Sequence, residues 1–460
     1  MAQWMGRNKP DRDRTSERII ITGGIILLPE GLKRADLEIV DGVISTIEAH
    51  IVPDHPCQIV NAEGRYILPG FIDIHTNGIA GFDLTSGVYD RQKKSFTLNE
   101  EAYISGLDQA LREYARRGTT RVVLSSLASP LEELKRAFSY ARAYKARQTN
   151  APWESVLGGL YVEGTFMKFS EYSGAHNPDY FHEPSERLFD ELQDAAGGLI
   201  RIVNVVPEWG EPALRLIQHI SSRGIVCAAG HTGATGSQYC LARKSGTKLA
   251  VHFLNGPTGT SFKSFDGGGA VESVLRADDL FVEIIADGYH VDKSYVLDTI
   301  SRKGVDQVVV ITDSMFTANF PDMDQFKVYG VSGKVSADCK FVEDADKPNT
   351  LFGSMLTMDV AFSNMINWLT AGVDGVWVKR HESIGLDSAI ARASEMCSKN
   401  PARVLGIFEP ASVCYDSSLS GFTGSLESGK LADLLIASLE LSEGKYRLNV
   451  ERVYVGGKMI

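Results

Sequence analysis

Histidine and carboxylate residues follow runs of apolar residues at several points along this sequence. They stand at or just beyond the ends of predicted strands: His75 and Asn77, Glu163, His231, His252 and Asn255, Asp287 and His290, and Asp313. Three imidazole or carboxylate ligands plus one water form a catalytic zinc site, which keeps its fourth position open. A lone histidine in such a place is more often a hydrogen-bonded core or loop residue, but here several of the ten histidines stand at predicted strand ends alongside carboxylates. We therefore predict Glu163, His231 and His252 as metal ligands.

Eight apolar segments separated by helix-length stretches are the elements that must position these residues. In order they are YILPGFIDIHTN, TRVVLSSL, VLGGLYVEG, LIRIVNVVPE, GIVCAAGH, KLAVHFLN, LFVEIIADG and QVVVITDS. Between them apolar residues recur at spacings of three and four, which is typical of amphipathic helices. Strands that are apolar almost throughout are buried on both faces. The pattern predicts an α/β protein with a (β/α)8 TIM-like barrel, whose active site forms at the carboxyl ends of the strands.

Short strands with turn signals occupy both ends of the chain. Residues 19–66 contain RIIITGGIILL and ADLEIV, and the C-terminal end returns to the same pattern in NVERVYVGGKMI. We predict a flexible tail over residues 1–18, a discontinuous β-sandwich domain of residues 19–66 and 409–460, and the barrel over residues 67–408.

Composition excludes several classes of protein. The 460 residues include 47 Lys and Arg against 58 Asp and Glu, and the net charge of −11 argues against a nucleic-acid or anionic-membrane surface. Six cysteines without a C-x-x-C pair fit neither a disulfide framework nor a thiolate zinc site. The chain has no run of 18 apolar residues, and its N-terminal apolar segment lacks the cleavage site of a signal peptide. We expect a cytoplasmic protein.

Nine motifs follow one another in a recognisable order. They are LPGFIDIHTNG, VEGTF with GAH at 174–176, AAGHTGAT, VHFLNG, IADGYHVD, VVVITDS, LFGSMLTM, NPARVLGI and GSLESGKLADLLI. In that order, and over nearly its whole length, the chain resembles the N-acetylglucosamine-6-phosphate deacetylase family of the amidohydrolase superfamily. The resemblance implies metal-dependent hydrolysis of the acetamide of N-acetylglucosamine 6-phosphate, giving glucosamine 6-phosphate and acetate.

The resemblance also implies roles at the reacting centre. Glu163, His231 and His252 would hold one divalent ion per subunit, which we expect to be zinc, with iron, manganese or cobalt as alternatives. Asp313 would be the acid–base residue, because a carboxylate beside a dication stays ionised, takes a proton from water and passes it to the departing amine. The structural alternative is that Asp313 caps a helix.

For the substrate, the resemblance implies a second group of residues. His176 would contact the sugar, and Asn255 with the backbone of Gly256 would contact the phosphate. Lys263 stands where the family has a phosphate-binding arginine, and a lysine neutralises phosphate only as a point charge. Family members are commonly homodimers whose phosphate pocket borrows residues from the neighbouring subunit, and His290 and Lys263 are the candidates here.

Two departures from the wider superfamily concern the number of metal ions. Many amidohydrolases carry His-x-His on the first strand and a carboxylated lysine on the fourth, which bridge two ions. Here the first strand has His75-Thr76-Asn77, and RIVNVVPE has no lysine. One ion is therefore expected, with His75 as a candidate for a second, weaker site.

Other functions are compatible with the same motifs. The chain could deacetylate another epimer of the sugar or an unphosphorylated N-acetyl amino sugar. A cyclic-amide hydrolase would share the barrel, although its two-metal ligand set is incomplete here. A non-catalytic sugar-phosphate-binding relative would be expected to lose a ligand or Asp313, and all of them remain.

Overall fold

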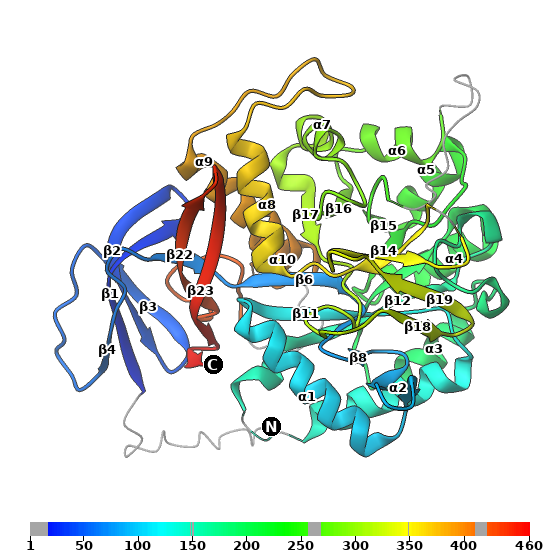
Figure 1. Cartoon of the computed structure of the whole chain (residues 1–460), viewed down its shortest axis with the longest axis horizontal. Coiled ribbons are helices and arrows are strands. Elements are labelled where there is room, and N and C mark those ends of the chain that lie inside the picture. The colour runs from blue at the N-terminus through cyan, green and yellow to red at the C-terminus, as the bar shows by residue number, and fades with distance from the viewer. Residues whose placement is uncertain (1–16, 148, 150, 256–267, 348, 410–420) are drawn as a thin grey trace, which may run out of the picture.

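The computed structural model describes residues 17–147, 149, 151–255, 268–347, 349–409 and 421–460 of the chain. In Figure 1 a sheet built from both ends of the chain lies beside a larger body of alternating strands and helices. None of the described helices is long and apolar enough to cross a membrane.

The larger body contains a parallel sheet whose eight described strands follow one another in chain order. They are β6 (Phe71–Thr76), β11 (Thr119–Ser126), β12 (Leu157–Phe166), β13 (Ile200–Val205), β14 (Val226–Ala229), β15 (Thr247–Ala250), β16 (Phe281–Ile285) and β17 (Val308–Ile311). Each apolar segment predicted from the sequence overlaps one of these strands. Every residue of β6, β11 and β12 is buried, as expected of strands covered on both faces.

The two outermost strands of this sheet, β6 and β17, meet at their carboxyl ends. The amide of Asp313 donates to the carbonyl of His75 at 2.8 Å, and the amide of Asn77 donates to the carbonyl of Ser314 at 2.8 Å. Just before these bonds, the Thr312 hydroxyl donates to Asp73 Oδ2 at 2.5 Å. This α/β arrangement fits a TIM-like barrel.

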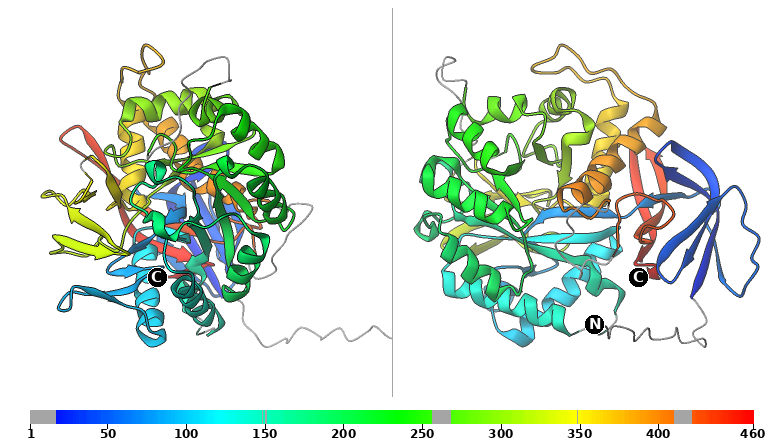
Figure 2. Two further views of the ribbon diagram at one scale, coloured as in Figure 1. Left: turned by 90° about the vertical axis from the view of Figure 1, so that its right-hand side faces the viewer. Right: turned by 180° about the vertical axis from the view of Figure 1, so that it is seen from behind.

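Helices connect successive strands and cover the outside of the sheet (Figure 2). They are α1 (Glu100–Arg116), α2 (Leu131–Ala146), α3 (Glu186–Ala195), α4 (Glu211–Ser221), α5 (Gly236–Ser245), α6 (Ala270–Arg276) and α7 (Lys293–Lys303), and beyond β17 come α8 (Met358–Thr370), α9 (Leu386–Ser394) and α10 (Asn400–Val404). In α1 the Asn99 side chain accepts the Ala102 amide at 3.0 Å and so caps the first turn. Its residues Tyr103, Leu107 and Leu111, spaced by four, face the core.

Strands from both ends of the chain share the second sheet. Its order is β24 (Lys458–Met459), β23 (Lys445–Val455), β22 (Leu434–Ser442), β5 (Tyr66–Pro69), β1 (Arg18–Leu28), β2 (Gly31–Val40) and β3 (Val43–Glu48), and β4 (Gln58–Asn61) also pairs with β1. The segment predicted as one strand, YILPGFIDIHTN, is two strands divided at Gly70. A Cβ at Gly70 would lie 2.3 Å from the Thr120 side chain, so glycine allows the close approach at this junction.

One strand of the second sheet, β22, is buried on both faces over its first four residues, Leu434 to Ala437. Leu434 and Ile436 pack into the apolar core of the second sheet. Leu435 and Ala437 point the other way and pack into the core of the larger body. Because successive side chains of a strand alternate between its faces, β22 joins the two cores.

Two small antiparallel sheets were not predicted. One contains β7 (Gly78–Ile79), β8 (Phe82–Asp83), β9 (Gly87–Asp90) and β10 (Ser95–Thr97), and the other β18 (Gln325–Val328), β19 (Val331–Val335), β20 (Phe341–Asp344) and β21 (Leu351–Ser354). They follow β6 and β17, the two strands that meet. The second is fastened beside the parallel sheet, because the Ser354 amide donates to the Asp313 carbonyl at 2.8 Å.

Candidate metal centre and active site

Three predicted site residues stand two positions beyond the ends of parallel strands. His231 follows β14, His252 follows β15 and Asp313 follows β17, and their φ angles are 53°, 20° and 47°. Left-handed backbone is unfavourable for residues that carry a Cβ, and it is concentrated at functional sites. Glu163 differs from them, because it lies inside β12 and needs no special backbone.

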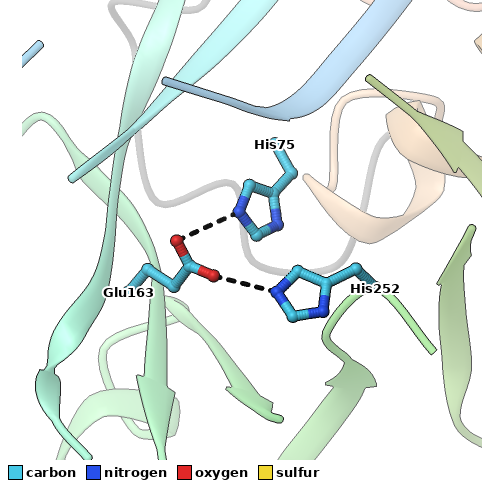
Figure 3. A group of neighbouring side chains, drawn as sticks. All are labelled: His75, Glu163 and His252. Atoms are coloured by element: carbon cyan, nitrogen blue, oxygen red, sulfur yellow. Dashed lines mark hydrogen bonds and ion pairs between the residues drawn. The ribbon is translucent and has the colours of Figure 1, made fainter. Parts of the chain in front are cut away.

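Four imidazole rings surround the carboxylate of Glu163, and all of these residues are buried. Oε1 of Glu163 lies 3.0 Å from His252 Nε2 and 3.4 Å from His231 Nε2. Oε2 lies 3.3 Å from His75 Nε2 and 3.5 Å from His176 Nε2. Figure 3 shows His75 and His252 approaching different oxygens of this carboxylate. The structure therefore brings the three predicted ligands together with His75 and His176.

This cluster has the composition of a metal site. Two overlapping groups among the described residues have ligand atoms within 4.8 Å of one another: His75, Glu163 and His252, and Glu163, His176 and His231. Imidazole nitrogen and carboxylate oxygen suit zinc and several neighbouring divalent metals. The residues fit such an ion, and they offer more donors than the three predicted.

The partners of Nδ1 show which nitrogen lone pairs are available at His231 and His252. Nδ1 of His231 faces the carbonyl of Tyr172 at 2.9 Å, and Nδ1 of His252 faces the carbonyl of Asn255 at 3.2 Å. A carbonyl only accepts, so each Nδ1 carries the proton and each Nε2 presents a lone pair toward Glu163. Both rings are thus arranged as metal ligands.

His176 is arranged in the opposite way. Its Nδ1 accepts the backbone N–H of Ala128 at 3.2 Å, so in the neutral ring the proton lies on Nε2. Nε2 then donates a hydrogen bond, and it has no lone pair to offer a metal ion. This favours the predicted contact with substrate over metal ligation.

The charged groups of the cluster shift one another's pKa values. Burial opposes the ionisation of Glu163, but the charges of His75 and His176 hold the pKa of this carboxyl well below its usual range. Burial lowers the pKa of His231 to about 4, which keeps this ring neutral at physiological pH. Burial raises the pKa of Asp313, and the charge of His75 opposes that shift.

Asp313 sits at the edge of the same cluster. Its Oδ1 accepts a hydrogen bond from Asn77 Nδ2 at 2.8 Å and lies 3.7 Å from His75 Nε2. The next helix in the described chain is α8, which begins at Met358, so the helix-cap alternative for Asp313 is wrong.

The cluster opens into a cavity of about 1020 Å³. Predicted site residues in its wall are Asn77, Glu163, His176, His231, His252, Asn255, His290 and Asp313. Nδ1 of His290 bonds Asp287 Oδ2 at 2.6 Å, and its buried Nε2 has no hydrogen-bond partner among the described residues. Two predicted phosphate contacts, Gly256 and Lys263, lie outside the described residues.

Two residues near the site were missed in the sequence. Glu283 is a buried glutamate in β16, and its Oε2 lies 2.9 Å from His75 Nδ1. The signal was a charged residue inside the apolar segment FVEII. Lys347 is the one lysine or arginine among the described residues of the cavity wall, and its Nζ donates to the Gly174 carbonyl at 3.3 Å. It lies in a loop of the unpredicted β18–β21 sheet, so no pattern in the sequence placed it there.

Known proteins of similar sequence are deacetylases. The N-acetylgalactosamine-6-phosphate deacetylase of Escherichia coli O157:H7 is 28% identical over 436 residues, which cover 94% of this chain and 97% of that protein. The N-acetylglucosamine-6-phosphate deacetylase of Bacillus subtilis is 26% identical over 415 residues, 90% of this chain and 91% of that protein.

Solved structures of similar fold agree with the architecture. A mutant N-acetyl-D-glucosamine-6-phosphate deacetylase from Mycobacterium smegmatis, in complex with N-acetyl-D-glucosamine-6-phosphate, has a TM-score of 0.74 at 22% identity and covers 96% of this chain and 99% of that one. The corresponding enzyme from Pasteurella multocida has a TM-score of 0.74 at 23% identity, with coverage of 96% and 99%. The amidohydrolase family model matches residues 66–460, and the chain therefore belongs to the amidohydrolase family.

Proposed function

We propose that this chain is a metal-dependent deacetylase that hydrolyses the acetamide of N-acetylglucosamine 6-phosphate to glucosamine 6-phosphate and acetate, in amino-sugar catabolism. The observation that carries this proposal is the buried Glu163–histidine cluster, with Asp313 beside it, at the wall of a cavity. Similarity to curated deacetylases over 90% and 94% of the chain supports the choice of reaction.

Glu163, His231 and His252 would hold one divalent ion, with zinc expected and iron, manganese or cobalt as alternatives. When bound, such an ion polarises the acetyl carbonyl and brings the pKa of water toward roughly 7. The directions of the Nε2 lone pairs at His231 and His252 support this ligand set. His75 remains the candidate for additional coordination.

Asp313 would move the protons of the reaction. A carboxylate at this position can take a proton from the attacking water and deliver it to the nitrogen, which cannot leave as an amide anion. The bond from Asn77 to Oδ1 occupies one carboxylate oxygen and leaves Oδ2 for the proton. This role would account for an aspartate just beyond the buried strand β17.

The remaining predicted residues would hold the substrate. His176 would donate its Nε2–H to a substrate oxygen, which its tautomer supports. From the resemblance, Asn255, Gly256, Lys263 and His290 would contact the phosphate, with Lys263 and His290 lent to the neighbouring subunit of a homodimer. Asn255 lines the cavity of its own chain, which is consistent with its role there.

N-acetylgalactosamine 6-phosphate is a second candidate substrate. A curated relative with this specificity in its name is 28% identical over 94% of the chain, slightly above the 26% of the glucosamine-type relative from Bacillus subtilis. The two sugars differ only in the configuration of one hydroxyl, so the same centre can act on either.

We further infer a closed barrel over residues 67–408 and a discontinuous β-sandwich domain of residues 19–66 and 409–460, in a cytoplasmic enzyme. Backbone bonds at the carboxyl ends of β6 and β17, where Asp313 donates to His75 and Asn77 donates to Ser314, support closure of the barrel. Pairing of β22 with β5 supports a domain shared by both ends of the chain and extends its first segment from residue 66 to Pro69.

Metal content and amine release test the proposed function together. The purified chain is analysed for bound metal and then assayed with both epimeric N-acetylhexosamine 6-phosphates, unphosphorylated N-acetylglucosamine and a cyclic amide. We expect a bound divalent metal, turnover of a phosphorylated amino sugar and none of the cyclic amide. Lys263→Ala should weaken the binding of the phosphorylated substrates only, by the ~1.5–3 kcal/mol of a charge-assisted hydrogen bond. A metal-loaded chain that releases amine from none of the amino sugars would refute the proposal.

A further inference from the structure

Glu283 is a charged residue in the interior of the parallel sheet. It lies in β16, between Val282 and Ile284, and its side chain is fully buried. Such positions in a barrel are usually filled by branched apolar residues. A buried carboxylate is retained only where other groups hydrogen-bond to it, so its partners indicate its role.

Both hydrogen bonds that the Glu283 side chain makes with described residues involve the same carboxylate oxygen. Oε2 lies 2.9 Å from Nδ1 of His75 and accepts the backbone N–H of His252 at 3.0 Å. The other oxygen, Oε1, is buried and has no hydrogen-bond partner among the described residues. Glu283 therefore connects β16 to two residues of the Glu163 cluster.

The contact with Glu283 sets the tautomer of His75. The carboxylate accepts, so in the neutral ring, the form that binds a metal ion, the proton lies on Nδ1 and the lone pair lies on Nε2. Nε2 lies 3.3 Å from Glu163 Oε2, and among the described residues it makes no hydrogen bond of good geometry. Tyr161 packs against the ring, with 4.6 Å between ring centroids, and limits its rotation.

His75 thus resembles His231 and His252 in the direction of its lone pair, and it differs from His176. At His231 and His252 a backbone carbonyl holds Nδ1, whereas at His75 a side-chain carboxylate does so. Of the three rings, His75 is therefore the one that loses the partner of its Nδ1 when a single side chain, that of Glu283, is replaced.

We propose that Glu283 is a positioning residue that holds Nδ1–H of His75 and so presents Nε2 of His75 to the metal ion at Glu163. The inference rests on the proposed function only in assuming that a divalent ion binds at Glu163. Carboxylates that hold the outer nitrogen of a ligating histidine commonly change metal affinity ~10–100-fold when they are replaced.

The test uses Co²⁺ as the probe, because its visible absorption reports the ligands around the ion. The full-length chain is freed of metal with a chelator and titrated with Co²⁺, and Glu283→Gln, His75→Ala and the double variant are treated in the same way. Gln keeps the size of Glu but allows either end of its amide to face Nδ1. We expect each single variant to weaken Co²⁺ binding ~10–100-fold and to change the absorption spectrum. The double variant should bind Co²⁺ no more weakly than His75→Ala alone, because Glu283 acts through His75.

Asp298→Asn is the matched control. Asp298 is likewise buried, bonds the ring nitrogen Nε2 of His381 at 2.7 Å and accepts the backbone N–H of Val376 at 2.7 Å, but it lies outside the cluster. This variant should lower the unfolding temperature and leave the Co²⁺ titration unchanged. If Glu283→Gln does not fold, as judged by circular dichroism, the experiment uses Glu283→Asp instead. This variant moves the carboxylate away from His75 by the length of one methylene group.

Three results would overturn the inference without refuting the metal site. Unchanged Co²⁺ affinity and spectrum in Glu283→Gln would give Glu283 a purely structural role, and unchanged affinity in His75→Ala would remove His75 from the metal. A loss in the double variant beyond that of His75→Ala would show that Glu283 acts through the backbone of His252. Failure of the wild-type chain to bind Co²⁺ at all would instead refute the metal site of the proposed function, and the inference with it.

Discussion

At the scale of single residues, distance alone does not separate the four histidines of the cluster. Their Nε2 atoms lie between 3.0 and 3.5 Å from the Glu163 carboxylate. The hydrogen-bond partner of Nδ1 decides whether Nε2 of the neutral ring carries a lone pair or a proton. That partner is a carbonyl or carboxylate oxygen at three rings and a backbone N–H group at His176.

This difference predicts opposite effects for two alanine substitutions. His231→Ala should remove the tightly bound metal and nearly all turnover, because it deletes a lone-pair donor. His176→Ala should retain the metal and lose catalytic efficiency, because it deletes a donor to substrate. Elemental analysis alongside steady-state kinetics distinguishes the two variants. Metal loss in His176→Ala with full occupancy in His231→Ala would reverse the assignment.

Asp313 gives a second prediction at this scale. Asp313→Asn keeps the size of the side chain and the contact with Asn77, but it cannot carry a proton. We expect kcat to fall by the ~10²- to 10⁴-fold of general acid–base catalysis with little change in KM. Asp298→Asn, remote from the cavity, controls for loss of a buried carboxylate. A normal kcat in Asp313→Asn would show that Asp313 has a structural role and does not transfer protons.

At the scale of elements, the parallel strands were predictable and the small sheets were not. Strands buried on both faces leave long apolar segments in the sequence, so all eight were found. The strands of β7–β10 and β18–β21 have two to five residues each, too few to show a period. Glu163, His231 and His252 were predicted because they lie at or near the ends of the apolar segments, although β12 continues past Glu163 to Phe166. Glu283 was missed because its importance depends on the register between β16 and its neighbours.

The unpredicted β7–β10 sheet contains a buried carboxyl group, that of Asp83, which should make the stability of the protein depend on pH. Burial raises the pKa of Asp83 to about 6, its Oδ1 accepts the amides of Thr85 and Ser86, and its buried Oδ2 has no hydrogen-bond partner among the described residues. The folded protein therefore binds this proton more tightly than the unfolded chain does. Between about pH 4 and pH 6 the free energy of unfolding should fall as pH rises, by up to ~3 kcal/mol from this group.

Asp83→Asn tests this dependence, because asparagine keeps the acceptor oxygen and does not ionise. Relative to wild type, the variant should become more stable by up to ~3 kcal/mol between pH 4 and pH 7 in urea unfolding. Asp90→Asn is the control, since Asp90 accepts the amides of Gln92 and Lys93 in the same kind of turn but has a lowered pKa. Its relative stability should move in the opposite direction. Parallel curves for wild type and Asp83→Asn would contradict the prediction.

At the scale of the whole molecule, β22 makes the two cores interdependent. Leu434 faces the core of the second sheet and Leu435 faces the core of the larger body, and both are fully buried. A shift of one residue in the pairing with β5 would exchange the two faces. The antiparallel register, which pairs Leu434 with Pro69 and Ala437 with Tyr66, therefore determines how both cores are filled.

We expect the chain to unfold as one cooperative unit for this reason. Leu434→Ala and Leu435→Ala should each destabilise it by ~2–5 kcal/mol and shift a single calorimetric transition. Leu441→Ala, at an exposed position of the same strand, serves as the control and should change little. Two separate transitions, with each variant shifting only one of them, would show that the cores unfold independently.

The pairing of β5 with β22 also bears on how the chain is made by the ribosome. β5 is complete at Pro69, but its partner begins at Leu434, so residues 70 to 433 must be synthesised first. At ~5–20 residues per second this takes roughly 20 to 70 s, during which the nascent chain exposes an unpaired strand edge. Chaperone binding to the ribosome-bound N-terminal segment, ending only when β22 emerges, is the expected consequence in the cell.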